Sequence, residues 1–443
     1  MDCSTSSNLL GVENDRMTAS SPPEIFTTDD EDEARDNFIH TYVNVDEHVN
    51  VCNLTKPSPE VQKPEIQRPE RPGETSSRHG SRSASRSYHT SEEDRELDNS
   101  LAEKEETEQI EQPDTDKFGF FVKSNGPVNK ELITIEKLRS REKKWIQMLD
   151  NWRYFMDEKF DLIRNRCRKG IPPSMRAKAW KYLTGATFQM EVSQNRFVFD
   201  YCMKQPGDPK WIDDIQKDLN RQFPDHEMFS RSGRFSEGGK EDLFHLLKCY
   251  TVLHPEEGYC QGQAPVAAVL LMHMPLRDAF YCFVQICHKY LPGYYSPGLE
   301  ALQVDGEILH KTLKVKAKHT YKHFRENHID PMLYMVEWFM CAFCRTLPWP
   351  TVLRVWDMFL CEGVKIIFKV AIVLLKYSLG TPAQCKRYPD MHSIMTRLRN
   401  LPPQITTEEF LIEKVCEMSF NDAEMERMHF AATKLRQIHF QNT

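Results

Sequence analysis

The sequence lacks the short motifs by which most enzymes bind a nucleotide, activate a nucleophile or hold a catalytic metal. It contains no GxxxxGK[ST] phosphate loop, no GxGxxG after a strand, no GxSxG and no HExxH. Sixteen histidines are present, but none pairs with another at zinc-site spacing beside a third ligand. We therefore expect the chain to hold no nucleotide, metal or cofactor of its own.

Long apolar runs and a secretory leader are also missing. The best apolar run, residues 366–375, is interrupted by Lys369 and is shorter than the roughly 18 residues of a membrane span. The N-terminus has no basic segment followed by an apolar core, so we predict neither a membrane span nor secretion. Thirteen cysteines follow no short-period framework and are expected to be reduced. Cys341 and Cys344 form a CxxC in an apolar run without further zinc ligands.

Charge divides the chain into two parts. Residues 1–115 carry a net charge of −16 against −7 for the whole chain, so the remaining 328 residues carry +9. The first part has acidic, proline-spaced and Ser/Arg-rich stretches with little apolar periodicity, which predicts a disordered tail. Such a tail offers sites for scaffold partners. Its Ser/Arg stretch lacks a folded stacking platform, so we expect no nucleic-acid partner.

The rest of the chain has the apolar periodicity of helices and no strand-like alternation. A long amphipathic helical region is predicted around residues 131–160. Further helices are expected at 209–221, 237–254, 263–274, 277–290, 298–315, 318–327, 331–345, 349–361 and 364–379, with about three more toward the C-terminus. An Asp330-Pro331 pair is expected to begin the helix at 331. The predicted fold is an all-α body of about 300 residues, with room for two packed helical subdomains.

The first segment of chemical interest is residues 211–226. Asp218 and Arg221 are three residues apart and can pair on a helix surface. Pro224 disfavours helix at Phe223, which places Arg221 in the last helical turn or just after it. A cation there can project outward. An ordinary salt bridge on a solvated helix end explains the same pattern.

The second segment is residues 256–265, EEGYCQGQAP. Gly258 and Gly262 bracket Tyr259 and Gln261, as in loops where the backbone turns tightly or approaches a partner. Tyr259 could pack inward while the amide of Gln261 points outward. A plain connection between two helices explains these residues equally well.

Taken together, the two segments resemble the TBC domain of Rab GTPase-activating proteins. Residues 215–221 resemble the family's IxxDxxR motif, and residues 259–261 its YxQ motif. The sequence is also similar to the branch that binds ezrin scaffolds, although its last residues, HFQNT, do not resemble a scaffold-domain ligand. Gln263 departs from the Met or Asn usual after YxQG. The family's opening RxxxW motif and its later helices are matched by Arg176, Trp180, Arg354, Trp356 and Asp357.

The resemblance implies bounds for the parts of the chain and roles for the site residues. The expected parts are a tail at 1–115, a helical lead-in at 116–167, the TBC core at 168–380 and packed C-terminal helices at 381–443. Arg221 would be an arginine finger and Gln261 a glutamine finger, both supplied in trans. Asp218 would orient the arginine, while Tyr259 and Gly262 would support the glutamine loop. The RxxxW and later-helix residues named above would be structural.

The resemblance also implies a partner and a place. The partner would be a Rab GTPase in its GTP form, which brings its own GTP and Mg²⁺. The protein would then be cytoplasmic, would reach endosomal or plasma membranes through the Rab, and would regulate vesicle trafficking. A non-catalytic scaffold that uses the same fold to hold Rabs is the alternative. The presence of both fingers favours the activator, because a chain that only binds needs neither.

Overall fold

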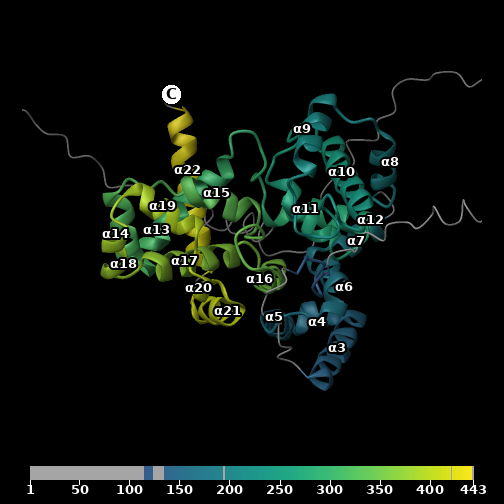
Figure 1. Cartoon of the computed structure of the whole chain (residues 1–443), viewed down its shortest axis with the longest axis horizontal. Helices are drawn as coiled ribbons and strands as arrows, with labels where there is room; N and C mark the ends of the chain where they lie inside the picture. Colours follow the sequence, from purple (N-terminus) through teal and green to yellow (C-terminus); the bar gives the residue numbers. More distant parts are fainter. Residues whose placement is uncertain (1–113, 123–133, 193–194, 421, 442–443) are drawn as a thin grey trace, which may run out of the picture.

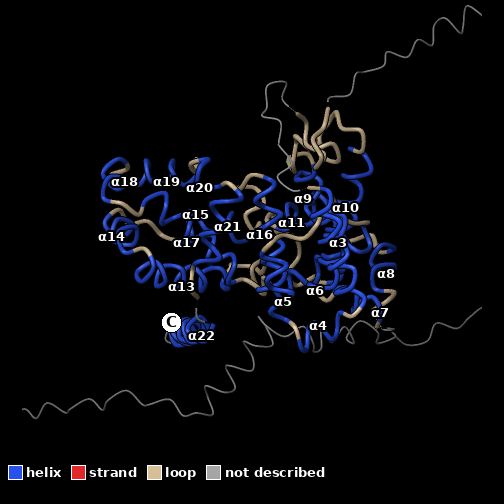
Figure 2. The backbone as a smooth tube through the Cα atoms, turned by 90° about the horizontal axis from the view of Figure 1, so that it is seen from below, coloured by secondary structure: helices blue, strands red, loops and turns tan. Residues whose placement is uncertain are grey.

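The computed structural model describes residues 114–122, 134–192, 195–420 and 422–441. Almost all of the predicted tail, residues 1–113, lies outside the described residues. Within the described part, helices carry the fold, and the only strand-like pairings are two isolated bridges, Thr115 with Phe121 and Phe120 with His226. The prediction of an all-α body is confirmed (Figure 2).

The helices form two lobes that meet at α16 (Figure 1). The N-terminal lobe comprises α3 (Ile135–Asp150), α4 (Trp152–Glu158), α5 (Phe160–Arg168), α6 (Pro173–Thr184), α7 (Ala186–Glu191), α8 (Val198–Lys204), α9 (Pro209–Leu219), α10 (Ser236–Leu253), α11 (Gln263–Leu271) and α12 (Leu276–Gln285), which runs on into a π-helical turn, Ile286–Tyr290. The C-terminal lobe comprises α13 (Glu300–Lys316), α14 (Lys318–Glu326), α15 (Met332–Met340), α16 (Trp349–Glu362), α17 (Lys365–Leu379), α18 (Pro382–Arg387), α19 (Met391–Arg399), α20 (Pro403–Thr406), α21 (Glu408–Glu417) and α22 (Asp422–Gln441).

Two deeply buried helices organise these lobes. Every residue of α11 is buried, and α11 packs against α10 and α12. In the other lobe α17 is the apolar run noted in the sequence, and it contacts α13, α16 and α21. A helix that is apolar on all sides must be enclosed by its neighbours, and both helices are. No described helix is long and apolar enough to cross a membrane.

Several predicted elements differ in detail from those observed. The region around 131–160 is not one helix, because the chain leaves helical geometry at Asn151 and Lys159 and so forms α3, α4 and α5. The helix predicted at 331–345 ends at Met340, and Ala342 and Phe343 then adopt positive φ of 44° and 61°. Asp330 does accept the Met332 N–H at 2.7 Å, one residue before the predicted start.

The two ends of the folded body also differ from expectation. The lead-in predicted as helical at 116–167 starts without a helix. Residues 114–122 are non-helical and include the last two residues of the predicted tail, and we term them the strap. It lies beside the loop that follows α9. Among the described residues, five helices rather than about three follow α17. Short helices such as α18 and α20 carry too few turns to show an apolar period in the sequence.

A buried carboxylate joins the lobes. Asp357 on α16 is fully buried and accepts four hydrogen bonds from residues 171–180 of the N-terminal lobe. Its donors are the Ile171 N–H at 2.7 Å, Arg176 Nε and Nη2 at 3.1 Å each, and Trp180 Nε1 at 2.9 Å. A carboxylate without such donors would be very costly to bury, so the four bonds fix α16 against α6.

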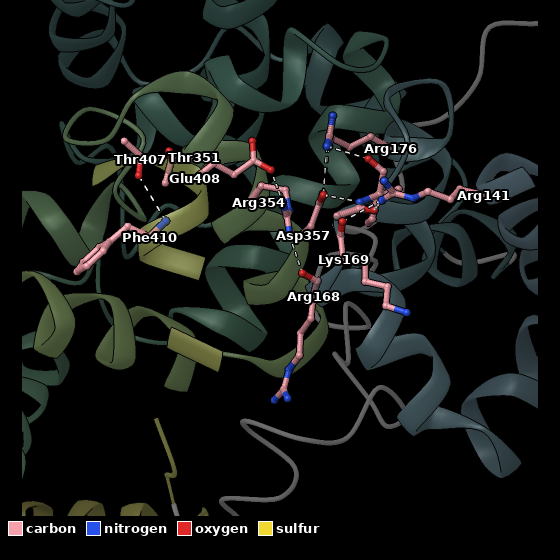
Figure 3. A network of polar contacts seen from close by, with 12 residues as sticks. Arg141, Arg168, Lys169, Arg176, Thr351, Arg354, Asp357, Thr407, Glu408 and Phe410 are labelled. Atoms are coloured by element: carbon pink, nitrogen blue, oxygen red, sulfur yellow. Dashed lines mark hydrogen bonds and ion pairs between the residues drawn. The ribbon is translucent and has the colours of Figure 1, made fainter. Parts of the chain in front are cut away.

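Arginines extend this junction on both sides (Figure 3). Arg354 on α16 pairs with Glu408 on α21, and its Nη2 donates to the carbonyl of Arg168 at 2.6 Å. Arg168 in turn forms a two-pronged pair with Glu362, at 2.7 and 2.6 Å. Gly170, with φ of +87°, allows this approach, because an added Cβ would lie 2.6 Å from Arg354 Nε.

Candidate functional site

Arg221 emerges where α9 stops. The helix ends at Leu219, and the Gln222 side chain donates to the Asp218 carbonyl at 3.0 Å, which occupies part of the free helix end. Arg221 therefore follows the helix rather than lying in its last turn. Its side chain is 49% exposed and forms an ion pair with Asp218, so part of the guanidinium remains open to a partner.

Asp218 lies at the centre of the site and contacts both of its segments. Its side chain is only 7% exposed, and its two oxygens serve two different residues. Oδ1 accepts from Arg221, while Oδ2 accepts from the Tyr259 hydroxyl at 2.6 Å. Burial, followed by this hydrogen bond to the carboxylate, raises the pKa of Tyr259, so the phenol stays a donor. A single carboxylate thus ties the end of α9 to the loop before α11.

Gln261 lies at the tip of that loop, two residues beyond Tyr259, and is exposed. Gly258 adopts φ of +66°, and an added Cβ would lie 2.2 Å from the Trp211 ring of α9. The loop can therefore approach α9 only because residue 258 has no side chain. Gly262 is also confined, since its added Cβ would lie 3.0 Å from Met340.

Gln263 closes the loop from inside. It is fully buried, and its Oε1 accepts the Cys260 N–H at 3.0 Å. Its own N–H donates to the Cys260 carbonyl at 2.9 Å. The residue that departs from the usual family pattern therefore supports the turn that presents Gln261. The sequence alone gave no signal of this contact beyond the position of Gln263 next to Gly262.

The structure brings the predicted finger residues together. Asp218 contacts both Arg221 and Tyr259. Gln261 lies two residues after Tyr259 on the same loop. This arrangement carries a permanent cation and an exposed neutral amide on two segments that Asp218 joins. It can place positive charge and a hydrogen-bonding amide on an anionic group of a partner. The ion pair with Asp218 agrees with both interpretations of the segment.

The sequence reasoning missed an aromatic cluster just beyond Arg221. Phe223 has φ of 36°, and its ring meets Phe120, Phe229 and Trp349 at centroid distances of 6.3, 6.5 and 5.8 Å. The only sequence signal was an unusually aromatic run, FGFF at 118–121, next to a polar tail.

The CxxC pair lies on the inner side of the loop that carries Gln261, where the Cys341 thiol contacts the Gly262 carbonyl at 4.0 Å. Cys341 and Cys344 are buried free thiols in the turn after α15. Burial raises the pKa of the Cys341 thiol to about 12, so it remains protonated and unreactive at neutral pH. Among the described residues, no group of three His, Cys, Asp or Glu side chains is placed to hold a metal ion.

Comparison with known proteins assigns the class of fold first. The sequence model of the Rab-GTPase-TBC domain family matches residues 173–379, which include Arg221, Gln261 and Asp357. The TBC domain of a Chlamydomonas flagellar RabGAP has a similar fold, with a TM-score of 0.52 and 21% identity over 69% of this chain and all of that one.

Relatives define the family more closely. The chain is 42% identical to Drosophila melanogaster "TBC1 domain family member whacked" over 72% of its own length and 87% of the relative. It is 54% identical to mouse "TBC1 domain family member 10A" and 52% identical to human "TBC1 domain family member 10B", over 71% and 72% of its length. It spans 62% and 39% of these two relatives. The chain belongs to the TBC domain family of Rab GTPase-activating proteins.

Proposed function

We propose that this protein accelerates GTP hydrolysis by a Rab GTPase, with Arg221 and Gln261 supplied in trans. The observation that carries the proposal is the shared carboxylate of Asp218, which binds Arg221 with one oxygen and the hydroxyl of Tyr259 with the other. Arg221 and the loop that carries Gln261 are thereby held by one carboxylate. The partner brings the GTP and Mg²⁺, and this chain adds the groups that a slow GTPase lacks.

Arg221 supplies charge. In phosphoryl transfer, negative charge spreads over the oxygens of the transferring group, and an arginine finger is worth about 10³–10⁵ in rate. The guanidinium is planar, always charged and able to donate to two oxygens at once. Because Asp218 occupies one side of the guanidinium, the side chain is held in one direction before the partner arrives. That preorganisation lowers the cost of placing it in the transition state.

Gln261 supplies orientation. An amide offers both an acceptor and donors, so its oxygen can accept a hydrogen bond from the attacking water while its NH₂ donates to a phosphate oxygen. Its exposure at the loop tip leaves it available to the partner. The glycines around it and the buried amide of Gln263 keep the loop in one shape. Gln261 would act in place of a glutamine of the GTPase itself.

The proposal includes a setting. By acting on a membrane-bound Rab, the protein would work in the cytoplasm, associate peripherally with endosomal or plasma membranes, and regulate vesicle trafficking. The tail, residues 1–115, would offer sites for scaffold partners. A non-catalytic scaffold is the competing function, and it requires neither Arg221 nor Gln261.

The test is single-turnover GTP hydrolysis by a panel of Rab proteins with the full chain. Arg221→Ala and Arg221→Lys should both fall to near the unassisted rate, because lysine keeps the charge but loses the planar fork. Lys217→Ala is a matched control, since Lys217 is an exposed cation paired with Asp213 on the same helix. If the full chain binds a Rab but does not raise its hydrolysis rate, the scaffold function is correct. If Arg221→Ala is as active as the unchanged protein, Arg221 is not an arginine finger and the proposed mechanism fails.

A further inference from the structure

The strap lies against the segment that follows Arg221, although the two are separated by about a hundred residues of sequence. Three polar contacts join residues 118–121 to residues 225–227. They are the Phe121 N–H donating to the Asp225 carbonyl at 2.9 Å, the Glu227 N–H donating to the Gly119 carbonyl at 2.9 Å, and His226 Nε2 at 2.9 Å from the Phe118 carbonyl. This pairing holds two short non-helical segments together as a two-stranded contact.

The strap has a defined shape of its own. Asp116 Oδ1 accepts the N–H groups of Phe118 and Phe120 at 2.8 and 3.0 Å, which closes a tight turn. Gly119 completes the turn with φ of +89°. An added Cβ at Gly119 would lie 2.7 Å from His226 Nε2, so the backbone approaches the buried histidine as closely as a glycine allows.

His226 links the strap to the segment that follows Arg221. It is 3% exposed, and its Nδ1 accepts the Met228 N–H at 3.2 Å. The Nε2 atom must then carry the proton and donate to Phe118, which defines a neutral tautomer. One ring thereby fixes the strap on one side and the loop after Arg221 on the other.

Phe120 packs the strap against the segment that follows Arg221. Its ring lies 4.8 Å from His226, 5.1 Å from Trp349 and 6.3 Å from Phe223, measured between centroids. Phe223 is two residues after Arg221 and has a φ of 36°, which is uncommon and strained for a bulky residue. Strained backbone of this kind persists only where neighbouring groups enforce it. Phe120 is one of the three rings that surround Phe223.

We propose that the strap is a positioning element of the reaction. In this proposal, Phe120 holds the positive-φ backbone at Phe223 and thereby positions Arg221, two residues earlier. Asp218 fixes the side chain of Arg221 from the helix side, and Phe120 fixes the backbone just beyond it. This inference rests on the proposed function. It assigns a role in catalysis to residues that precede the family-matched region, which begins at residue 173.

The experiment uses full-length Phe120→Ala with the Rab that the unchanged protein stimulates best. We expect kcat to fall by about 10–100-fold with KM within threefold, because misplacing a catalytic group by about 1 Å costs on that order. Phe120→Tyr, which keeps the ring, should stay within threefold. Val122→Ala is the matched control, since Val122 lies on the same strap and is 49% exposed.

A second measurement separates positioning from general loosening of the fold. Phe120→Ala should weaken binding to the Rab loaded with GDP and aluminium fluoride, a mimic of the transferring phosphoryl group, by about tenfold. Binding to the Rab loaded with a non-hydrolysable GTP analogue should stay within threefold. If Phe120→Ala does not fold, Asp116→Ala gives the same comparison, because Asp116 is exposed and shapes only the turn.

Three results in Phe120→Ala would overturn the inference. The first is that kcat and KM are both unchanged. The second is a raised KM with unchanged kcat, which would mean that the strap contacts the Rab directly, and the third is equal weakening of both Rab complexes. The fate of the proposed function is read separately. If Arg221→Ala keeps full activity, the proposed function fails, whereas loss in Arg221→Ala with no effect in Phe120→Ala refutes only the role of the strap.

Discussion

Replacing Asp218 tests the centre of the site, because this carboxylate serves two partners of different chemistry. In Asp218→Ala, the Tyr259 hydroxyl is left buried without its acceptor, which costs about 1–3 kcal/mol of unfolding free energy. Arg221 loses its charged neighbour as well, but it is half exposed and can be hydrated, so its contribution to stability is small. The stability loss is therefore expected to come almost entirely from Tyr259.

Asp218→Asn separates the two partners. The guanidinium only donates, so the amide oxygen must face Arg221 and the amide NH₂ must face Tyr259, whose hydroxyl can turn and accept. The fold should then keep most of its stability. The bond to Arg221 loses the charge of its acceptor and becomes weaker, although the guanidinium stays charged. We expect a roughly tenfold lower kcat with unchanged KM, against a hundredfold or greater loss in Asp218→Ala.

The assay combines urea unfolding with single-turnover GTP hydrolysis. Asp213→Asn is the control, because Asp213 is an exposed carboxylate on α9 that pairs with Lys217. Adding Tyr259→Phe to Asp218→Ala should recover part of the lost stability but none of the lost rate. If Asp218→Ala hydrolyses GTP as fast as the unchanged protein, Asp218 does not orient Arg221. The reasoning built on the shared carboxylate is then wrong.

Three further outcomes are expected. A Rab with leucine at its own switch glutamine should still be stimulated within about tenfold, while Gln261→Ala should lose about 10²–10³ of the rate on either Rab, by analogy with a lost transition-state donor; an inert leucine Rab together with an active Gln261→Ala would refute the glutamine finger. Asp357→Ala should lower the unfolding free energy by about 3–5 kcal/mol in urea titrations, because it strands the buried Arg176. Burial lowers the pKa of His273 to about 4, so its contribution to stability is complete above pH 6.5 and declines as the pH falls toward 4, by at most about 3 kcal/mol. His273→Gln should show a correspondingly smaller loss of stability between pH 7 and pH 4 in the same titrations.

The sequence predicted the helices well because apolar period is a local property. Helix α9, the placement of Arg221 near its end and the pairing with Asp218 all depend on residues within a few positions of one another. The hydrogen bond between Tyr259 and Asp218 spans 41 residues, so only the family resemblance could suggest that their loops act together. The roles of the finger residues stay a prediction until they are measured.

What the sequence missed has three physical causes. The strap contacts residues about a hundred positions away, and FGFF in a polar neighbourhood does not reveal which surface it covers. Positive φ at Phe223 is not a local preference of phenylalanine, and the three rings beside it come from distant parts of the chain or from the following turn. The breaks at Asn151 and Lys159 interrupt a continuous apolar pattern without any proline or glycine to signal them.

The junction at Asp357 has a consequence for how the molecule opens. Its carboxylate belongs to α16, while all four of its donors come from residues 171–180 of the other lobe. Neither lobe can separate locally without stranding buried charge on both sides. The lobes should therefore behave as one cooperative unit in native-state hydrogen exchange, with the amide of Ile171 exchanging only through global unfolding. The Ile171 amide, in the non-helical segment just before α6, would then be among the slowest-exchanging amides in the protein.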